Sequence, residues 1–228
     1  MIIMNVSFIK KRWLLSCLFA FACSACNPYS TASDNTQQLQ LAEWKAARQK
    51  HSLECIDSAR LILKDGDIIT RTGNDFTSQG LRQLCQLDAT YSHCGIVSIS
   101  DSNIYVYHAL GGEINPDQKL KKETLGNFCD ALDNLGFGVF RFPLTADQNG
   151  KLHKLLSHHY AAGLPFDMKF DLHTDTAMYC SEFVYKMLEQ ASAYGFRFRK
   201  DTLNGLAYVA PDRIFLHPRC SEIRRYVY

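Results

Sequence analysis

The sequence predicts one α+β domain behind an N-terminal targeting segment, and three observations support this prediction. Two runs rich in β-branched and aromatic residues, 93–100 and 104–110, are joined by turn-forming residues at 101–103, which predicts a β-hairpin. Apolar residues at helical spacing in 147–162 and 180–191 predict two amphipathic helices. With 228 residues, of which 46% are hydrophobic, the chain suits one well-buried domain.

The first 26 residues have the pattern of a secretory signal. Lys10-Lys11-Arg12 supplies a positive segment, and residues 13–25 form an apolar run that is too short for a confident membrane span. The sequence Cys23-Ser24-Ala25-Cys26 is similar to the lipobox of bacterial lipoproteins, with Cys26 as the lipidated residue and Cys23 where Leu is usual. Cleavage before Cys17 or Cys23, or retention of the segment as an uncleaved anchor, are the alternatives.

The lipobox resemblance implies an outer-membrane lipoprotein of the bacterial cell envelope, which faces the periplasm and is held to the membrane by an N-terminal lipid anchor. Residue 27 follows the lipidated cysteine, and an Asp at this position would indicate retention elsewhere. Asn27 therefore points to the outer membrane. Residues 27–36 are predicted to be a tether and residues 37–228 a single domain. Beyond Cys26 the chain keeps 22 of its 25 basic residues against all 23 acidic ones, so no nucleic-acid surface is expected. The oligomeric state is not indicated.

The remaining elements follow from apolar periodicity and turn residues. They are a helix over 37–63 with a break near His51-Ser52, a strand at 68–71, a helix at 76–87, a polar loop at 115–122, a helix at 123–135, a strand at 136–142, a strand-like run at 166–172, a helical turn at 211–215 and a final strand at 222–228.

Six of the nine cysteines lie beyond the signal. They are Cys55, Cys85, Cys94, Cys129, Cys180 and Cys220. An oxidising periplasm permits disulfides among them, but the sequence does not give the pairing. The Cys23-x-x-Cys26 pair lies within the signal and has no matching second pair, and no Gly-rich phosphate loop is present, so neither a metal nor a cofactor is expected.

Cys180 is the candidate nucleophile. It stands where the polar loop 171–176 leads into a helix, and the free N–H groups and dipole of a helix N-terminus favour a thiolate. His93 begins one strand of the predicted hairpin and His108 ends the other, so alternation can place both imidazoles on one face. The same alternation sends Cys94 to the opposite face, where we expect it to be a packing residue.

These residues carry a family resemblance. The segments that carry it are Gly66-Asp67-Ile68, Ser92-His93-Cys94-Gly95-Ile96-Val97, Val106-Tyr107-His108-Ala109, Phe166-Asp167 and Tyr179-Cys180-Ser181-Glu182-Phe183-Val184-Tyr185. Together they resemble the circularly permuted papain-like branch of the NlpC superfamily, above all its bacterial YiiX/YaeF-type lipoprotein group, with lecithin retinol acyltransferase as a more distant relative. The resemblance implies that 37–228 is a catalytic domain with a central antiparallel β-sheet packed by helices and its nucleophile at a helix N-terminus.

Carried over residue by residue, the resemblance implies that Cys180 is the nucleophile, His93 the general base and His108 the third, orienting group. The bacterial group commonly has Glu where this chain has His108, whereas the acyltransferase relatives use a second histidine. Glu113 is an alternative orienting group. The oxyanion hole is expected to include the Cys180 N–H, with Tyr91 as a possible second donor.

The predicted function is a cysteine hydrolase that cleaves an amide or ester bond through a thioester, with a peptide or an acylated small molecule as substrate. The periplasmic location favours a cell-envelope amidase or peptidase. The alternatives are a lipid acyl hydrolase or acyltransferase of the same fold and a catalytically silent ligand-binding lipoprotein. Asp167 and Glu182 are expected to shape the loop and the surface charge.

Overall fold

The computed structural model describes residues 29–112, 115–116 and 118–228. The predicted signal with Cys26 and its alternatives, and the alternative orienting residue Glu113, lie outside these residues. The chain divides into two units, Met1–Leu41 and Ala42–Tyr228, and every strand belongs to the second. Within the described part, no helix has both the length and the apolar character needed to cross a membrane.

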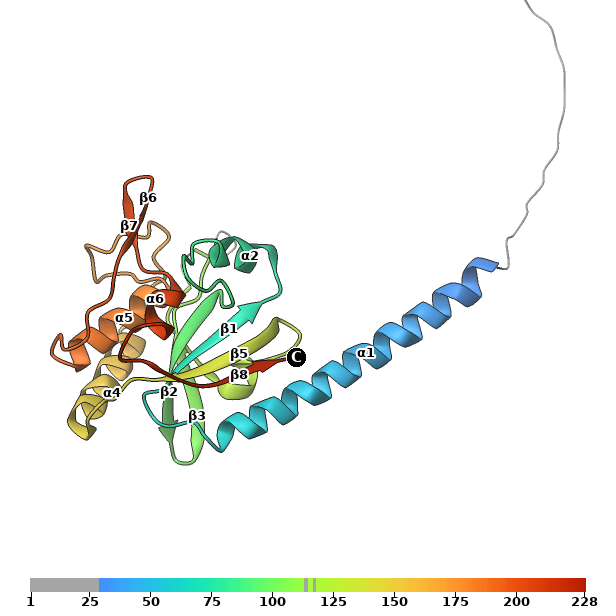
Figure 1. The fold of residues 1–228 in the computed structure, drawn as a ribbon, viewed down its shortest axis with the longest axis horizontal. Helices are drawn as coiled ribbons and strands as arrows, with labels where there is room; N and C mark the ends of the chain where they lie inside the picture. Colours follow the sequence, from blue (N-terminus) through green and yellow to red (C-terminus); the bar gives the residue numbers. More distant parts are fainter. Residues whose placement is uncertain (1–28, 113–114, 117) are drawn as a thin grey trace, which may run out of the picture. The chain divides into compact units, whose positions relative to one another are not determined.

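A six-stranded antiparallel sheet forms the centre of the second unit (Figure 1). Its order is β4 (Lys121–Thr124), β3 (Asn103–His108), β2 (His93–Ser100), β1 (Ile68–Gly73), β5 (Asn134–Arg141) and β8 (Ser221–Val227). The predicted hairpin is confirmed: Ser100 pairs with Asn103, and Asp101 and Ser102 form the two-residue turn at φ 49° and 66°. Positive φ at both turn positions matches the twist of the flanking strands.

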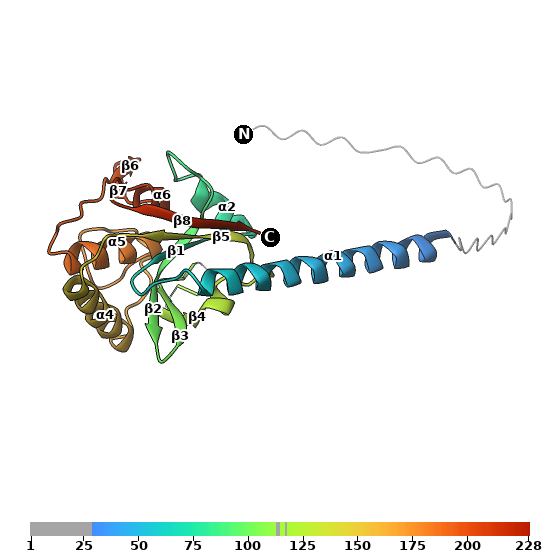
Figure 2. The same cartoon turned by 60° about the horizontal axis from the view of Figure 1, so that its bottom comes forward.

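Each face of the sheet is covered by its own apolar layer. Helices α4 (Ala146–Ala161) and α5 (Cys180–Ala191) pack together on the face that carries Ile68 and Ile96 (Figure 2). The opposite face, with Ile69 and Val97, is covered by α3 (Leu125–Phe128) and the last turns of the first helix. The remaining elements are α2 (Phe76–Arg82), the hairpin β6 (Asp201–Leu203) and β7 (Leu206–Tyr208), which was not predicted, and α6 (Pro211–Phe215).

Helix α1 (Tyr29–Arg60) is longer and more regular than predicted. It begins before Gln37, so residues 29–36 of the predicted tether are helical. The predicted break at His51-Ser52 is wrong, because Ser52 is buried and its hydroxyl donates to the Gln49 carbonyl 2.8 Å away, one turn earlier in the same helix.

Two further predictions are wrong for reasons of local hydrogen bonding. Residues 115–122 and 123–135 were predicted as a loop and a helix, but Lys121–Thr124 is strand β4. Helix α3 spans Leu125–Phe128 and begins after Thr124, which caps it by accepting a hydrogen bond from the Asn127 N–H (3.3 Å). Residues 166–172 do not form a strand. The Asp167 carboxylate instead accepts the N–H groups of Lys169 (2.8 Å) and Asp171 (2.6 Å), as expected of a loop-shaping residue.

Candidate active site

Cys180 is the first residue of α5, and the start of this helix is fixed by polar contacts to its neighbours. Glu182 accepts the Tyr179 N–H (3.2 Å), Ser181 Oγ donates to the Val209 carbonyl (2.6 Å), and Tyr179 Oη accepts the Val209 N–H (2.9 Å). The following turns bury apolar side chains against α4 and the sheet. The nucleophile candidate therefore stands at a fixed helix N-terminus, as predicted.

The Cys180 thiol has a sulfur neighbour that matters for its chemistry. Cys94 lies on the face of β2 opposite to His93, as predicted, and it is fully buried. Its thiol hydrogen-bonds to the Cys180 sulfur and lowers the pKa of Cys180, while burial acts in the opposite direction. Burial and the Cys180 thiolate raise the pKa of Cys94. Cys94 is thus a donor to the thiolate form of Cys180 as well as a packing residue.

Two histidines and a carboxylate form a hydrogen-bonded chain across three strands. His93 Nε2 lies 2.8 Å from His108 Nδ1, and His108 Nε2 lies 3.1 Å from Glu123 Oε2. Lys121 Nζ binds the other carboxylate oxygen of Glu123 at 3.1 Å. Both imidazoles pack on the ring of Phe128, with centroids 5.9 Å and 5.1 Å from it. The predicted placement of both imidazoles on one face of the hairpin is confirmed.

The surroundings keep both imidazoles neutral. Burial lowers the pKa of His93 well below its ordinary value, and the nearby charges of Arg71, His108 and Lys121 lower it further. Burial also lowers the pKa of His108, although its hydrogen bond to Glu123 opposes this. The bond to His108 in turn lowers the pKa of Glu123 to about 2. A neutral imidazole beside a thiol is the protonation state that a general base needs.

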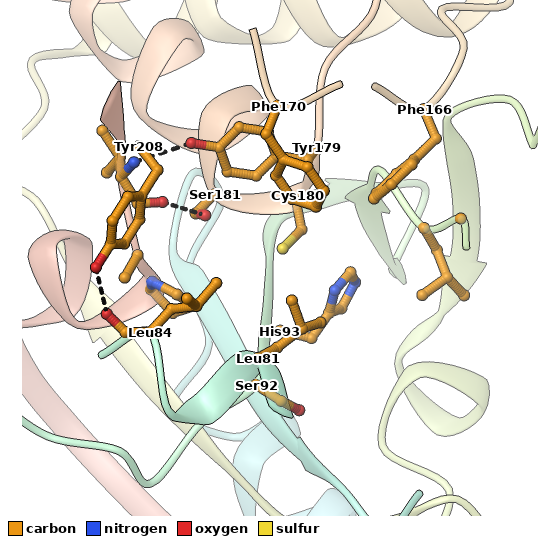
Figure 3. A pocket seen from close by; sticks show the side chains of 15 residues that line it. Leu81, Leu84, Ser92, His93, Phe166, Phe170, Tyr179, Cys180, Ser181 and Tyr208 are labelled. Atoms are coloured by element: carbon orange, nitrogen blue, oxygen red, sulfur yellow. Dashed lines mark hydrogen bonds between the residues drawn. The ribbon is translucent and has the colours of Figure 1, made fainter. Parts of the chain in front are cut away.

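Cys180 and His93 line one open pocket of about 510 Å³, counted out into the solvent at its mouth (Figure 3). Its walls are mostly apolar and come from α2 and the segment after it, the segment after β3, the 166–170 loop and the start of α6: Leu81, Leu84, Leu110, Gly111, Phe166, Phe170, Val209, Ala210 and Pro211. Within the described chain, no hydrogen bond joins the Cys180 sulfur to His93 in this state. Catalytic hydrogen bonds often close only when substrate is bound.

The hydroxyl groups in the pocket wall are already bonded to the protein backbone. Ser92 Oγ accepts the Gly73 N–H (3.0 Å), and Tyr208 Oη donates to the Leu84 carbonyl (3.0 Å). Ser181 and Tyr179 are held by Val209, as described above. The hydroxyl groups of this wall are therefore held by the protein itself, which leaves the Cys180 thiol and the His93 imidazole as its candidate reactive groups.

The structure brings Cys180, His93 and His108 together, but two expectations about their neighbours change. Tyr91 was a possible oxyanion donor, yet its ring is fully buried between Phe140 and Phe215 and does not line the pocket. Glu123 was missed because residues 123–135 were predicted as a helix. The preference of Thr for the N-cap position could have placed the helix start after Thr124 and left Glu123 outside the helix.

An antiparallel sheet that carries the histidine and a later helix headed by the cysteine define a circularly permuted papain-like fold. No protein-family model matches the chain, and no curated protein matches it. Among solved structures, the chain is similar to the crystal structure of YiiX from Escherichia coli O157:H7, a DUF1105 protein, with 23% sequence identity and a TM-score of 0.58 over 71% of this chain and 97% of YiiX. The chain has the fold of YiiX, so the fold predicted from the motifs is confirmed.

YiiX is described as a metalloprotein, so the residues of this site were tested as metal ligands. Across 29–112, 115–116 and 118–228, no group of three or more His, Cys, Asp or Glu residues could hold a metal ion. Both ring nitrogens of His108 are engaged, by His93 and Glu123, and the sulfur of Cys180, a free cysteine, accepts a hydrogen bond from the Cys94 thiol. The described residues do not fit a metal centre.

Proposed function

We propose that the chain is a cysteine hydrolase that cleaves an amide or ester bond through a thioester. The observation that carries this proposal is that Cys180 and His93 line one pocket, while Nε2 of His93 is held by His108. A thiol nucleophile needs a base within reach and a third group that orients this base.

In this mechanism His93 Nδ1 takes the thiol proton, and the Cys180 sulfur attacks the substrate carbonyl carbon. The carbonyl electron pair moves to oxygen, where the Cys180 N–H, which has no partner within its own helix, donates a hydrogen bond. Collapse of the intermediate breaks the bond to the amine or alcohol, which leaves with the proton from His93. Water, deprotonated by His93, then attacks the thioester and releases the acid and the thiol.

Two substrate classes fit this chemistry. The predicted secretory signal and lipobox favour an amide of the cell envelope, which makes the chain an amidase or peptidase. The pocket favours the second candidate, an acyl chain carried by a lipid or an amine, because its wall is apolar and its hydroxyls are already engaged. Pockets with such walls gain affinity from each buried methylene group, by about 0.8 kcal/mol.

Selective alkylation tests the thiol chemistry. Iodoacetamide at pH 7 should modify Cys180 faster than the other cysteines, and a Cys180→Ala variant should lose this fast reaction. Cys85 is a useful control, because it is more exposed than the buried Cys180, yet burial raises its pKa to about 12. A Cys85→Ala variant should keep the fast reaction. If Cys180→Ala keeps it too, the fast-reacting thiol is a different cysteine and Cys180 is not the activated nucleophile.

A series of p-nitrophenyl esters from acetate to laurate separates the two substrate classes. An acyl-binding pocket should raise kcat/KM by about fourfold for each added methylene group until the pocket is full. A flat series, together with faster cleavage of a peptide p-nitroanilide, would assign the pocket to peptide amides.

A further inference from the structure

We propose that Glu123 is a positioning residue of this site, whose carboxylate sets the tautomers of His108 and His93 so that His93 turns an unprotonated nitrogen to Cys180. This inference rests on the proposed function and adds a residue to its machinery. Glu123 reaches the site because β4 pairs with β3, where Glu123 lies opposite Val106 and Lys121 opposite His108. Its side chain is 23% exposed, whereas that of His108 is fully buried.

The direction of each hydrogen bond follows from Glu123. An ionised carboxylate can only accept, so the proton in the His108–Glu123 bond is on His108 Nε2. A neutral imidazole has one N–H, so His108 Nδ1 must be an acceptor. His93 Nε2 then has to donate the 2.8 Å bond between the two rings. This leaves His93 Nδ1 without a proton, which is the form of the base that can deprotonate a thiol.

Without the carboxylate, the hydrogen bond between the two imidazoles would have no preferred direction of donation. His108 could then carry its proton on Nδ1 and donate to His93 Nε2, which would place the His93 proton on Nδ1, the nitrogen needed as base. Glu123 removes this alternative. Its own orientation is fixed by Lys121, which binds Oε1 and leaves Oε2 for His108.

Glu123 also changes the charge balance around the imidazoles. The charged and titratable groups that face them are Arg71 from β1, Lys121 and Glu123 from β4, and the Cys180 thiol from α5. Arg71 is held over the Phe128 ring and donates to the Phe128 carbonyl at 3.1 Å. The positive charges of Arg71 and Lys121 disfavour a protonated His93. The negative charge of Glu123 favours the protonated ring that forms when His93 takes the thiol proton.

The test is the pH profile of Cys180 alkylation by iodoacetamide, followed on the Cys180 peptide by mass spectrometry in the full chain. Glu123→Gln keeps the size of the side chain but loses the charge and the purely accepting character. We expect the midpoint of the Cys180 profile to rise by about one pH unit, and the rate at pH 7 to fall about tenfold. The rates should converge at high pH, where the thiol ionises without help.

Two comparisons make this a test of positioning. Glu222→Gln, the same change in an exposed ion pair with Arg225, should leave the profile unchanged. In a His108→Ala background Glu123→Gln should have no further effect, because Glu123 acts through His108. Nitrogen-15 spectra of the histidines should show protonated Nε2 on His108 in the wild type and a mixture of tautomers in Glu123→Gln.

The outcomes separate this proposal from the proposed function. If Cys180 is selectively reactive but Glu123→Gln leaves both its midpoint and the His108 tautomer unchanged, the role of Glu123 is refuted and the hydrolase proposal stands. A shift that persists in the His108→Ala background would also refute it, because Glu123 would then act directly. If Cys180 in the wild type titrates like an ordinary thiol, the proposed function itself fails.

Discussion

The two halves of the site are held in place by different forces. On the cysteine side, Cys180 heads a helix whose side chains are almost all buried, and the pocket around it is lined mostly by apolar side chains. On the histidine side, His93, His108 and Glu123 are joined by directional hydrogen bonds that cross from β2 to β3 to β4. Packing tolerates small changes of chemistry at constant volume, whereas a hydrogen-bonded chain fails when one donor or acceptor is lost.

This difference predicts how mutations divide between the two halves. Changes on the histidine side should reduce turnover with little effect on stability, because they remove function from side chains that the core does not need. Changes in the packing between the two strands that carry the histidines should reduce stability first. The three variants below test this division, from the largest expected effect to the smallest.

His93→Gln should have the largest effect on the reaction. Glutamine fills similar space and can still bond to His108, but it cannot take a proton from Cys180. We expect kcat/KM on a p-nitrophenyl ester to fall by about 10³-fold, the scale of a lost general base. The midpoint of urea unfolding should move little. A variant that keeps a tenth or more of the wild-type activity would show that His93 is not the base.

Gly95→Ala should lose stability, because Gly95 lies where the two histidine strands meet. A Cβ at this position would come within 2.7 Å of Val106 Cγ1, 2.9 Å of the Tyr107 carbonyl oxygen and 3.0 Å of His108 Cβ. Neither the strand backbone nor the buried His108 can give way easily, so we expect a loss of about 2 kcal/mol in the free energy of unfolding and a displaced His108.

Gly80→Ala is the matched control for this variant, measured by urea unfolding. A Cβ at Gly80, in the middle of α2, would meet nothing within 4 Å. Replacing a helical glycine by alanine should raise stability by up to about 1 kcal/mol. Equal effects of the two substitutions would contradict the close packing between β2 and His108.

The cysteine side could be predicted from local sequence, and the histidine side only in part. A helix pattern after a polar loop suffices to place Cys180 at a helix start, and strand alternation with turn residues at 101–103 suffices to bring His93 and His108 to one face. Both signals lie within a few residues of the side chains they position.

Glu123 could not be placed in this way, because its role depends on the register between β3 and β4. That pairing joins segments separated by a long connection, and Lys121–Thr124 carries no apolar alternation that would indicate a strand. The same limit applies to Cys94. Alternation correctly sends it to the face opposite His93, but only the packing of α5 on that face brings its thiol to Cys180.

Cys94 belongs to the packed cysteine side and also affects the pKa of Cys180. Its replacement should have the smallest effect of the three variants. In the wild type, the hydrogen bond from the Cys94 thiol lowers the pKa of Cys180. Cys94→Ala removes this hydrogen bond. We expect the midpoint of Cys180 alkylation to rise by about half a pH unit, which slows the reaction at pH 7 about threefold. Cys94→Ser keeps a donor of similar size and should retain the wild-type midpoint.

Cys129→Ala provides the control on the other face of the sheet, where a fully buried thiol packs in the opposite apolar layer. It should leave the Cys180 midpoint unchanged. If Cys94→Ala also leaves the Cys180 midpoint unchanged, the cysteine side only holds Cys180 in place. The pKa of the Cys180 thiol is then set by the histidine side. If the shift is larger than that of Glu123→Gln, the division is reversed: a packing residue would then control the thiol more strongly than the hydrogen-bonded chain does.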